Sequence, residues 1–299
     1  MIHIKHLRAG EFCQANPFRT AWKLLGADRL IIGVLLVVIV GNQSLSRADS
    51  TQLALPPVSG KITAETAEAW GVLEYQGRYR VINNVWNKGA ATASYKQTVF
   101  LETIDGKSGL GWRWNWPDGR TVVAYPEVVC GDKPWDPPSP IKNQFPFQVR
   151  SKRVAADFDL TINATGVYNL AFTLWLISDP ANPRGSITHE IMIWTANHGG
   201  TPAGIKRAAA YIHGASFDLY VNPNQTDNSG ANRNTWTYIA LAAQRPLLKG
   251  SLDIRACLDH LLETGLISTN SFVASLELGT EVSGGIGSVE VRDYSINIR

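Results

Sequence analysis

Short apolar runs separated by turn residues make up most of the chain after residue 70. The runs are rich in Val, Ile, Tyr, Phe and Trp, and Gly, Asn and Pro lie between them. The strands that this pattern predicts are 79–85, 94–102, 121–129, 147–154, 155–162, 167–177, 190–194, 216–221, 235–242, 271–278 and 288–298. Many short strands at this spacing are typical of an all-β sandwich or barrel.

One segment, residues 251–266, has the period of a helix instead. Its apolar positions at helical spacing are Ile254, Cys257, Leu258, Leu261 and Leu262. Ser251 is a candidate N-cap, and Gly265 is a candidate C-terminal stop. The pattern therefore predicts two packed sheets with a single helix lying outside them.

The first 48 residues have the layout of a secretory signal. A basic leader precedes an apolar run at 30–40, and Ser46 and Ala48 supply small residues before a possible cleavage after Ala48. The alternative is an uncleaved membrane anchor, but a spanning helix needs about 20 apolar residues and this run is much shorter. We therefore expect a cleaved signal peptide (1–48), a secreted protein and no stable association with a membrane.

The remaining chain divides by composition. Residues 49–69 are small, polar and Pro-containing, and predict a linker or loose N-terminal arm; residues 70–299 form the predicted domain. The formal charge of +3 comes from the leader, because removing residues 1–48 leaves 22 basic and 23 acidic side chains, a net charge of −1. No basic stripe favours nucleic acid, so a neutral partner and a monomer are expected.

The cysteines leave two alternatives open. Cys130 and Cys257 are predicted either to form one disulfide in an oxidising compartment or to be two buried free thiols. Neither has a His or a second Cys nearby at metal-ligand spacing, so no metal site is expected.

A carboxylate lies on an otherwise apolar strand face at 189–194. Strand alternation places Glu190, Met192 and Trp194 on one side, away from Ile191 and Ile193. A carboxylate beside Met and Trp lies in a partly apolar surface, where neighbours can change its pKa and reactivity.

A second carboxylate pattern occurs at 276–281. Glu277, Gly279 and Glu281 share one face, and Gly279 leaves space for a close approach to the backbone. Two carboxylates that flank a sugar are what glycoside hydrolysis needs: a separation of about 5 Å gives retention, and a wider gap gives inversion. A structural or solvated role for each Glu is the alternative.

Several ordered motifs resemble glycoside hydrolase family 12, the jelly-roll endoglucanases and xyloglucanases. The motifs are 81–86 (VINNVW), 114–117 (WNWP), 125–127 (YPE), 168–175 (YNLAFTLW), 190–194 (EIMIW) and 279–281 (GTE), within a resemblance that runs from about Gly77 to Arg299. The resemblance implies a two-sheet jelly roll with one packed helix and a concave substrate cleft. It also implies retaining hydrolysis of internal β-1,4-glucan bonds without a cofactor, with Glu190 as nucleophile and Glu281 as general acid/base.

The expected partner is a β-glucan: cellulose, mixed-linkage glucan or xyloglucan. Flat sugar faces stack on indole rings, and sugar hydroxyls pair with amides. The candidate substrate-binding residues are Asn84, Trp86, Trp135, Met192, Trp194 and Asn197. Trp194 could equally be a core residue, and Trp135 could anchor its own Pro-rich loop.

One departure from the family pattern concerns Thr173. Family members usually have an Asp there, which is expected to hydrogen-bond the nucleophile; Thr173 carries no charge, so an altered pH optimum or a lower rate is expected. Two alternatives to a general endoglucanase remain: a xyloglucan-specific enzyme and a non-catalytic glucan-binding jelly roll. The sequence context of Glu190 argues against a xylanase of a related jelly-roll family.

Overall fold

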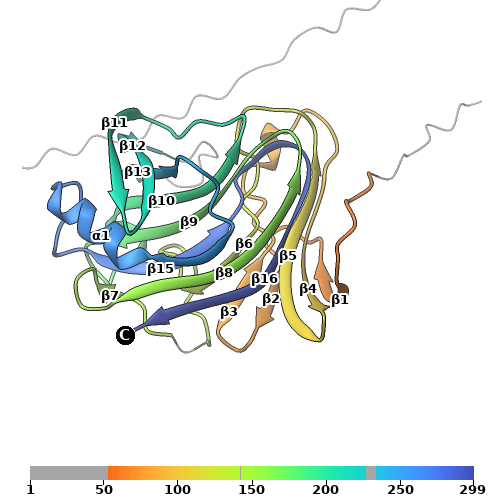
Figure 1. The fold of residues 1–299 in the computed structure, drawn as a ribbon, viewed down its shortest axis with the longest axis horizontal. Helices are drawn as coiled ribbons and strands as arrows, with labels where there is room; N and C mark the ends of the chain where they lie inside the picture. Colours follow the sequence, from red (N-terminus) through yellow and green to blue (C-terminus); the bar gives the residue numbers. More distant parts are fainter. Residues whose placement is uncertain (1–52, 142, 227–233) are drawn as a thin grey trace, which may run out of the picture. The chain divides into compact units, whose positions relative to one another are not determined.

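The computed structural model describes residues 53–141, 143–226 and 234–299 (Figure 1). The predicted signal peptide lies outside these residues. Two β-sheets pack face to face and are joined at one corner, where Val282 and Gly284 pair with Tyr168 and Val167; the described chain has one α-helix beside them. The predicted jelly-roll sandwich with a single packed helix is therefore confirmed.

The first sheet is antiparallel throughout its described pairs. In spatial order its strands are β1 (Lys61–Thr66), β4 (Lys96–Ile104), β5 (Lys107–Trp116), β16 (Val282–Ile298), β8 (Val154–Ala164) and β14 (Lys249–Asp253).

The second sheet carries the functional face. In spatial order its strands are β2 (Val72–Tyr75), β3 (Tyr79–Ile82), β6 (Glu127–Gly131), β15 (Phe272–Gly279), β9 (Val167–Ile177), β10 (Ile187–His198), β13 (Trp236–Ala243), β12 (Ala215–Gln225) and β11 (Ile205–Ile212). The short β7 (Phe147–Gln148) pairs with the start of β15. Strands β10 and β13 run parallel, and the other described pairs are antiparallel. Two 3₁₀ turns, η1 (Lys88–Ala90) and η2 (Arg184–Ser186), lie in loops.

The hydrophobic core lies between the two sheets. Strand alternation sends Ile191 and Ile193 of β10 into this core, while Met192 and Trp194 belong to a separate cluster on the opposite face. Trp112 and Trp114 of β5 are fully buried in the core, so packing explains them. The face opposite the core is left free for a ligand.

The helix α1 (Ile254–Glu263) begins two residues later than Ser251 would require. Asp253 is its N-cap, and the Asp253 carboxylate accepts a hydrogen bond of 2.9 Å from the Ala256 N–H. Gly265, with φ +69°, follows the helix end as predicted. The apolar side of α1 packs against β8 and β11. None of the helices in the described residues has the length and apolar character needed to cross a lipid bilayer.

Three other predictions need correction or completion. The stretch 49–69, predicted as a linker or loose arm, contains β1, which pairs with β4, so this part belongs to the sandwich. The strand predicted at 121–129 begins only at Glu127, because Pro126 cannot donate a ladder hydrogen bond. Cys130 and Cys257 are both free and buried, which settles the cysteine alternatives in favour of thiols.

Candidate active site

A cleft of about 370 Å³ opens on the second sheet, on the face away from the core. Strands β9, β10 and β15 supply its floor, and loops supply its walls. The residues that line it are Trp70, Asn84, Trp86, Val122, Tyr125, Lys133, Trp135, Thr173, Trp175, Arg184, Glu190, Met192, Gln225, Thr226, Trp236, Glu277 and Glu281. Five of them are tryptophans, so the cleft offers several flat aromatic surfaces next to carboxylates.

Glu190 occupies the middle of the floor. Its neighbours in register are Trp175 on β9 and Tyr238 on β13. The indole N–H of Trp236 donates a hydrogen bond of 2.9 Å to Oε2 of Glu190. Trp236 also packs edge-on against Trp175, with ring centroids 5.3 Å apart. Aromatic packing therefore holds the donor that orients the Glu190 carboxylate.

Glu281 lies in the turn between β15 and β16 and is held by Asn169 at the start of β9. The Asn169 side-chain amide donates to the Glu281 carboxylate. In return the Glu281 N–H donates to Asn169 Oδ1 at 2.9 Å, and the Asn169 N–H donates to the Glu281 carbonyl at 3.1 Å. Three hydrogen bonds between two residues leave this carboxylate little freedom to turn away from the cleft.

Both carboxyls have raised pKa values. Burial raises the pKa of Glu190 to about 8, the Glu281 carboxylate contributes to the rise, and the Trp236 N–H opposes it. Burial likewise raises the pKa of Glu281 to about 7, against the Asn169 hydrogen bond. Burial therefore favours the protonated form of both carboxyls, and the negative charge of one disfavours ionisation of the other. One ionised and one protonated carboxyl in the same cleft is the arrangement that acid-assisted nucleophilic displacement requires.

A buried ionic cluster lies beside this pair. The Lys133 ammonium is 2.6 Å from Glu127 Oε1 and 3.4 Å from Glu277 Oε2. Asn84 donates to Glu127 Oε1 at 2.8 Å. Burial raises the pKa of Glu127 well above its usual value, although the Lys133 charge opposes this.

Thr173 does not contact Glu190 by any hydrogen bond found among the described residues. Its hydroxyl lies 2.7 Å from the Tyr125 hydroxyl, and its register neighbours are Met192 and Glu277. The expected partner of the nucleophile at this position is therefore replaced by the Trp236 N–H. Gly279, expected to allow a close approach to the backbone, makes room for Tyr125: a Cβ there would lie 2.7 Å from the Tyr125 ring.

The structure brings four of the six predicted substrate-binding residues to the cleft, namely Asn84, Trp86, Trp135 and Met192. Trp194 and Asn197 are outside its lining. Trp194 is buried and packs with Met192, as the core alternative predicts. The Asn197 amide donates to the Gly200 carbonyl and closes its own turn.

The residues of this site that sequence reasoning missed include Trp70, Lys133, Asn169, Trp175 and Trp236. A signal existed for Trp175, because alternation on its strand places it on the same face as Thr173. No local pattern marked Asn169 or Trp236, because their partners are 112 and 46 residues away in the sequence.

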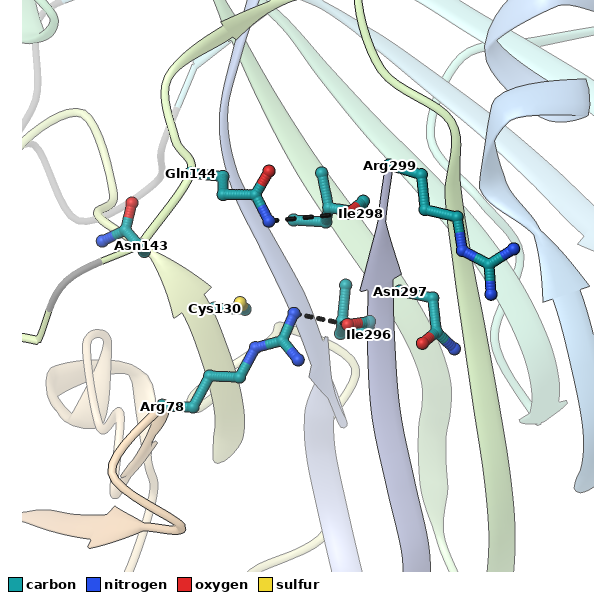
Figure 2. A pocket seen from close by; sticks show the side chains of 8 residues that line it. All are labelled: Arg78, Cys130, Asn143, Gln144, Ile296, Asn297, Ile298 and Arg299. Carbon is teal, nitrogen blue, oxygen red and sulfur yellow. Dashed lines mark hydrogen bonds between the residues drawn. The ribbon is translucent and has the colours of Figure 1, made fainter.

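A second cavity, of about 360 Å³, is lined by Arg78, Cys130, the 143–144 pair and the last four residues of the chain (Figure 2). Arg78 donates to the Ile296 carbonyl, and Gln144 donates to the Ile298 carbonyl at 3.5 Å. No Asp or Glu side chain lines this cavity, so it lacks an acid–base pair. Within residues 53–141, 143–226 and 234–299, no three His, Cys, Asp or Glu side chains are grouped so as to hold a metal ion.

Comparisons with known proteins agree with this geometry. The family model described as glycosyl hydrolase family 12 matches residues 77–299. Endoglucanase S of Pectobacterium parmentieri is 29% identical over 226 residues, which cover 74% of this chain and 82% of that protein. An inactive glycoside hydrolase of Phytophthora nicotianae is 26% identical, over 81% of this chain and 93% of its own length. The native family 12 xyloglucanase from Bacillus licheniformis superposes with a TM-score of 0.70 at 28% identity, covering 79% of this chain and all of that one.

Proposed function

The chain belongs to glycosyl hydrolase family 12 and is a glycoside hydrolase of the endo-β-1,4-glucanase type, and we propose that it works by double displacement with Glu190 and Glu281. One observation carries the mechanistic proposal: two buried carboxyls with raised pKa values line a single cleft.

In the first step Glu281 gives its proton to the glycosidic oxygen while Glu190 attacks the anomeric carbon. The bond to the leaving sugar breaks, and a glycosyl ester forms on Glu190. The Trp236 N–H stays on Oε2 of Glu190, which leaves the other oxygen for attack. In the second step the ionised Glu281 takes a proton from water, and that water releases the sugar from Glu190 with net retention. Asn169 keeps Glu281 aimed at the bond through both steps.

The proposed substrate is a neutral glucan chain lying across the strands of the floor. Trp70, Trp86 and Trp135 offer indole surfaces for sugar faces along the cleft. Cellulose-type and mixed-linkage glucans fit this chemistry. Xyloglucan is a second candidate substrate, supported by the xyloglucanase likeness reported above.

Replacing Glu190 by Gln tests the mechanism, because Gln keeps the shape and removes the nucleophile. We expect reducing-sugar release from barley glucan, carboxymethylcellulose and xyloglucan to fall to background, while near-UV circular dichroism stays as in the parent. Proton NMR of the first product formed by the parent should show the β-anomer. Parent-level turnover by Glu190→Gln, or the α-anomer as first product, would disprove the assignment.

A non-catalytic glucan-binding role is the second candidate function, because one relative is an inactive glycoside hydrolase. The contacts that hold Glu190 and Glu281 favour turnover. Binding of soluble glucan by the parent with no release of reducing sugar would support the binding role.

We also propose that the protein is secreted after removal of residues 1–48, from the apolar run at 30–40 and the small residues before Asp49. N-terminal sequencing of the exported protein should begin at Asp49; retention of the leader in a membrane fraction would contradict this.

A further inference from the structure

The buried cluster of Lys133, Glu127 and Glu277, hereafter the lysine cluster, has no place in the two-carboxyl mechanism. Its three members are among the most buried charged residues of the chain, at 3%, 0% and 1% exposure. Lys133 and Glu277 nevertheless line the substrate cleft together with Glu190. The cluster is therefore at the boundary between the protein interior and the site of the reaction.

Stability alone is a weak explanation for this cluster. The free energy needed to remove two charges from water offsets most of the stabilisation that their pairing provides. Replacing a buried ion pair by apolar side chains is therefore often neutral or stabilising. The hydrogen bonding is also incomplete: Glu127 Oε2 and Asn84 Oδ1 have no partner among the described residues. Such an arrangement calls for a role beyond holding the fold together.

Short contacts hold the charges of the cluster together. Burial raises the pKa of Glu127, the Lys133 charge opposes this rise, and the Glu277 charge adds to it. Although burial opposes it, Glu127 and Glu277 raise the pKa of Lys133, so the ammonium stays charged. Glu277 is 3.4 Å from that ammonium and accepts a 2.8 Å hydrogen bond from Ser275, so the two members that line the cleft form an ion pair.

The register places this ion pair near the nucleophile. Glu277 on β15 is opposite Thr173 on β9, and Thr173 is opposite Met192 on β10, two residues from Glu190. Two strand spacings amount to about 10 Å, and two residues along a strand to about 7 Å. Buried Thr173 and Met192 lie between these groups along the sheet, and the open cleft lies on their other side, so water screens only part of the interaction.

We propose that Glu277 and Lys133 are positioning residues that act on Glu190 in opposite directions, the anion delaying and the cation promoting its ionisation, and so shift the pH range of activity. The other charged or titratable groups around Glu190 are Glu281 beyond β15, Tyr238 on β13 and Arg184 of η2. Among these groups, only the lysine cluster contains a positive and a negative charge that are buried together. The kinetic part of this inference rests on the proposed function, whereas its electrostatic part does not.

Two variants test the effects of the negative and the positive charge on Glu190 separately. Glu277→Gln keeps the side-chain volume and removes one negative charge, so the midpoint of Glu190 ionisation should move down by up to about one pH unit, the full amount applying where Glu127 keeps its proton. Lys133→Gln combined with Glu127→Gln leaves Glu277 as the only charge, so the midpoint should move up by a similar amount. Glu102→Gln is the matched control, because Glu102 is equally buried but belongs to β4 of the first sheet.

Carbon-13 NMR of glutamate labelled at the side-chain carboxyl reads the midpoint directly. In a Glu281→Gln background, Glu190 is the remaining carboxyl of the catalytic pair. Its resonance is identified because it disappears when Glu190→Gln is added. The limb of the kcat/KM profile that reports Glu190, measured on barley glucan with Glu281 present, should move in the same directions for the same substitutions.

Opposite changes of the midpoint for the two cluster variants, with the control unchanged, support the inference. The inference would be overturned by midpoints equal to that of the background protein, by changes of the same sign, or by an equal change in Glu102→Gln. If the lysine cluster only anchored the loop that carries Trp135, its variants would leave the midpoint of Glu190 ionisation unchanged. If the double variant does not fold, the sign of the change in Glu277→Gln decides. A parent without glucan hydrolysis but with opposite changes of the NMR midpoint would end the proposed function and leave this inference standing.

Discussion

The hydrogen bond from Trp236 to Glu190 gives a sharp test of how the site is tuned. Trp236→Phe removes the indole N–H but keeps an aromatic ring against Trp175, whose centroid is 5.3 Å away. Because the N–H stabilises the ionised form of Glu190, its loss should raise the pKa of that carboxyl further above about 8.

The size of the effect follows from the nature of the bond. A hydrogen bond to a charged group contributes about 1.5–3 kcal/mol, and a pKa difference of one corresponds to about 1.4 kcal/mol, so the pKa of Glu190 should rise by about one to two. Attack needs Glu190 ionised while Glu281 keeps its proton, and this is a minor form because the pKa of Glu190 (about 8) lies above that of Glu281 (about 7). A further rise in the pKa of Glu190 should therefore move the alkaline limb of kcat/KM to higher pH by that amount. At a pH below the limb, kcat/KM should fall about tenfold for each pH unit that the limb moves.

The assay is the initial rate of reducing-sugar release from barley glucan across a pH series. Trp175→Phe is the matched control: Trp175 belongs to the same aromatic group, but its buried Nε1 has no hydrogen-bond partner among the described residues. The limb should move in Trp236→Phe and stay in Trp175→Phe. A loss of rate in Trp236→Phe that is equal at every pH would refute the reasoning, because it would show a packing defect.

Three further predictions concern other parts of the structure. Asn169→Ala frees the Glu281 carboxylate, so kcat on glucan should fall about tenfold to a hundredfold. The fall should be much smaller on aryl glucosides, because their good leaving groups need little acid assistance, and an equal loss on both substrates would contradict this prediction. Trp70 lies on the cleft wall and is 48% exposed, so Trp70→Ala should raise KM for polymer several-fold and leave kcat nearly unchanged. An unchanged KM would show that Trp70 is not part of the binding surface. Burial and the nearby Glu290 charge raise the pKa of Glu102 to about 7. The folded state therefore binds more protons than the unfolded chain, and the stability of the fold should decrease as pH rises from about 4.5 to about 7. Glu102→Gln should flatten this dependence of Tm on pH, and a parallel dependence would disprove the Glu102 assignment.

The predicted strand pattern agreed best where burial and alternation act together. The strand expected at 167–177 is β9 without change, and the faces of β10 are as predicted, because an alternating pattern has only one way to bury its apolar half. Agreement was poorer where local chemistry or tertiary pairing dominates. β11 has the sequence Ile-Lys-Arg-Ala-Ala-Ala-Tyr-Ile, which lacks the expected alternation and is a strand because β12 pairs with it.

The sequence by itself determined the strand-rich composition, the single helix of the described residues and the faces of the strands, because each depends on residues within a few positions of each other. Only the tertiary structure decided which distant groups meet: Asn169 with Glu281, Trp236 with Glu190, and Lys133 with Glu127 and Glu277. These contacts arise from strand order and register across the sheet, which long-range packing determines. The pKa values of the site depend on the same contacts and on burial, so they too are properties of the folded chain.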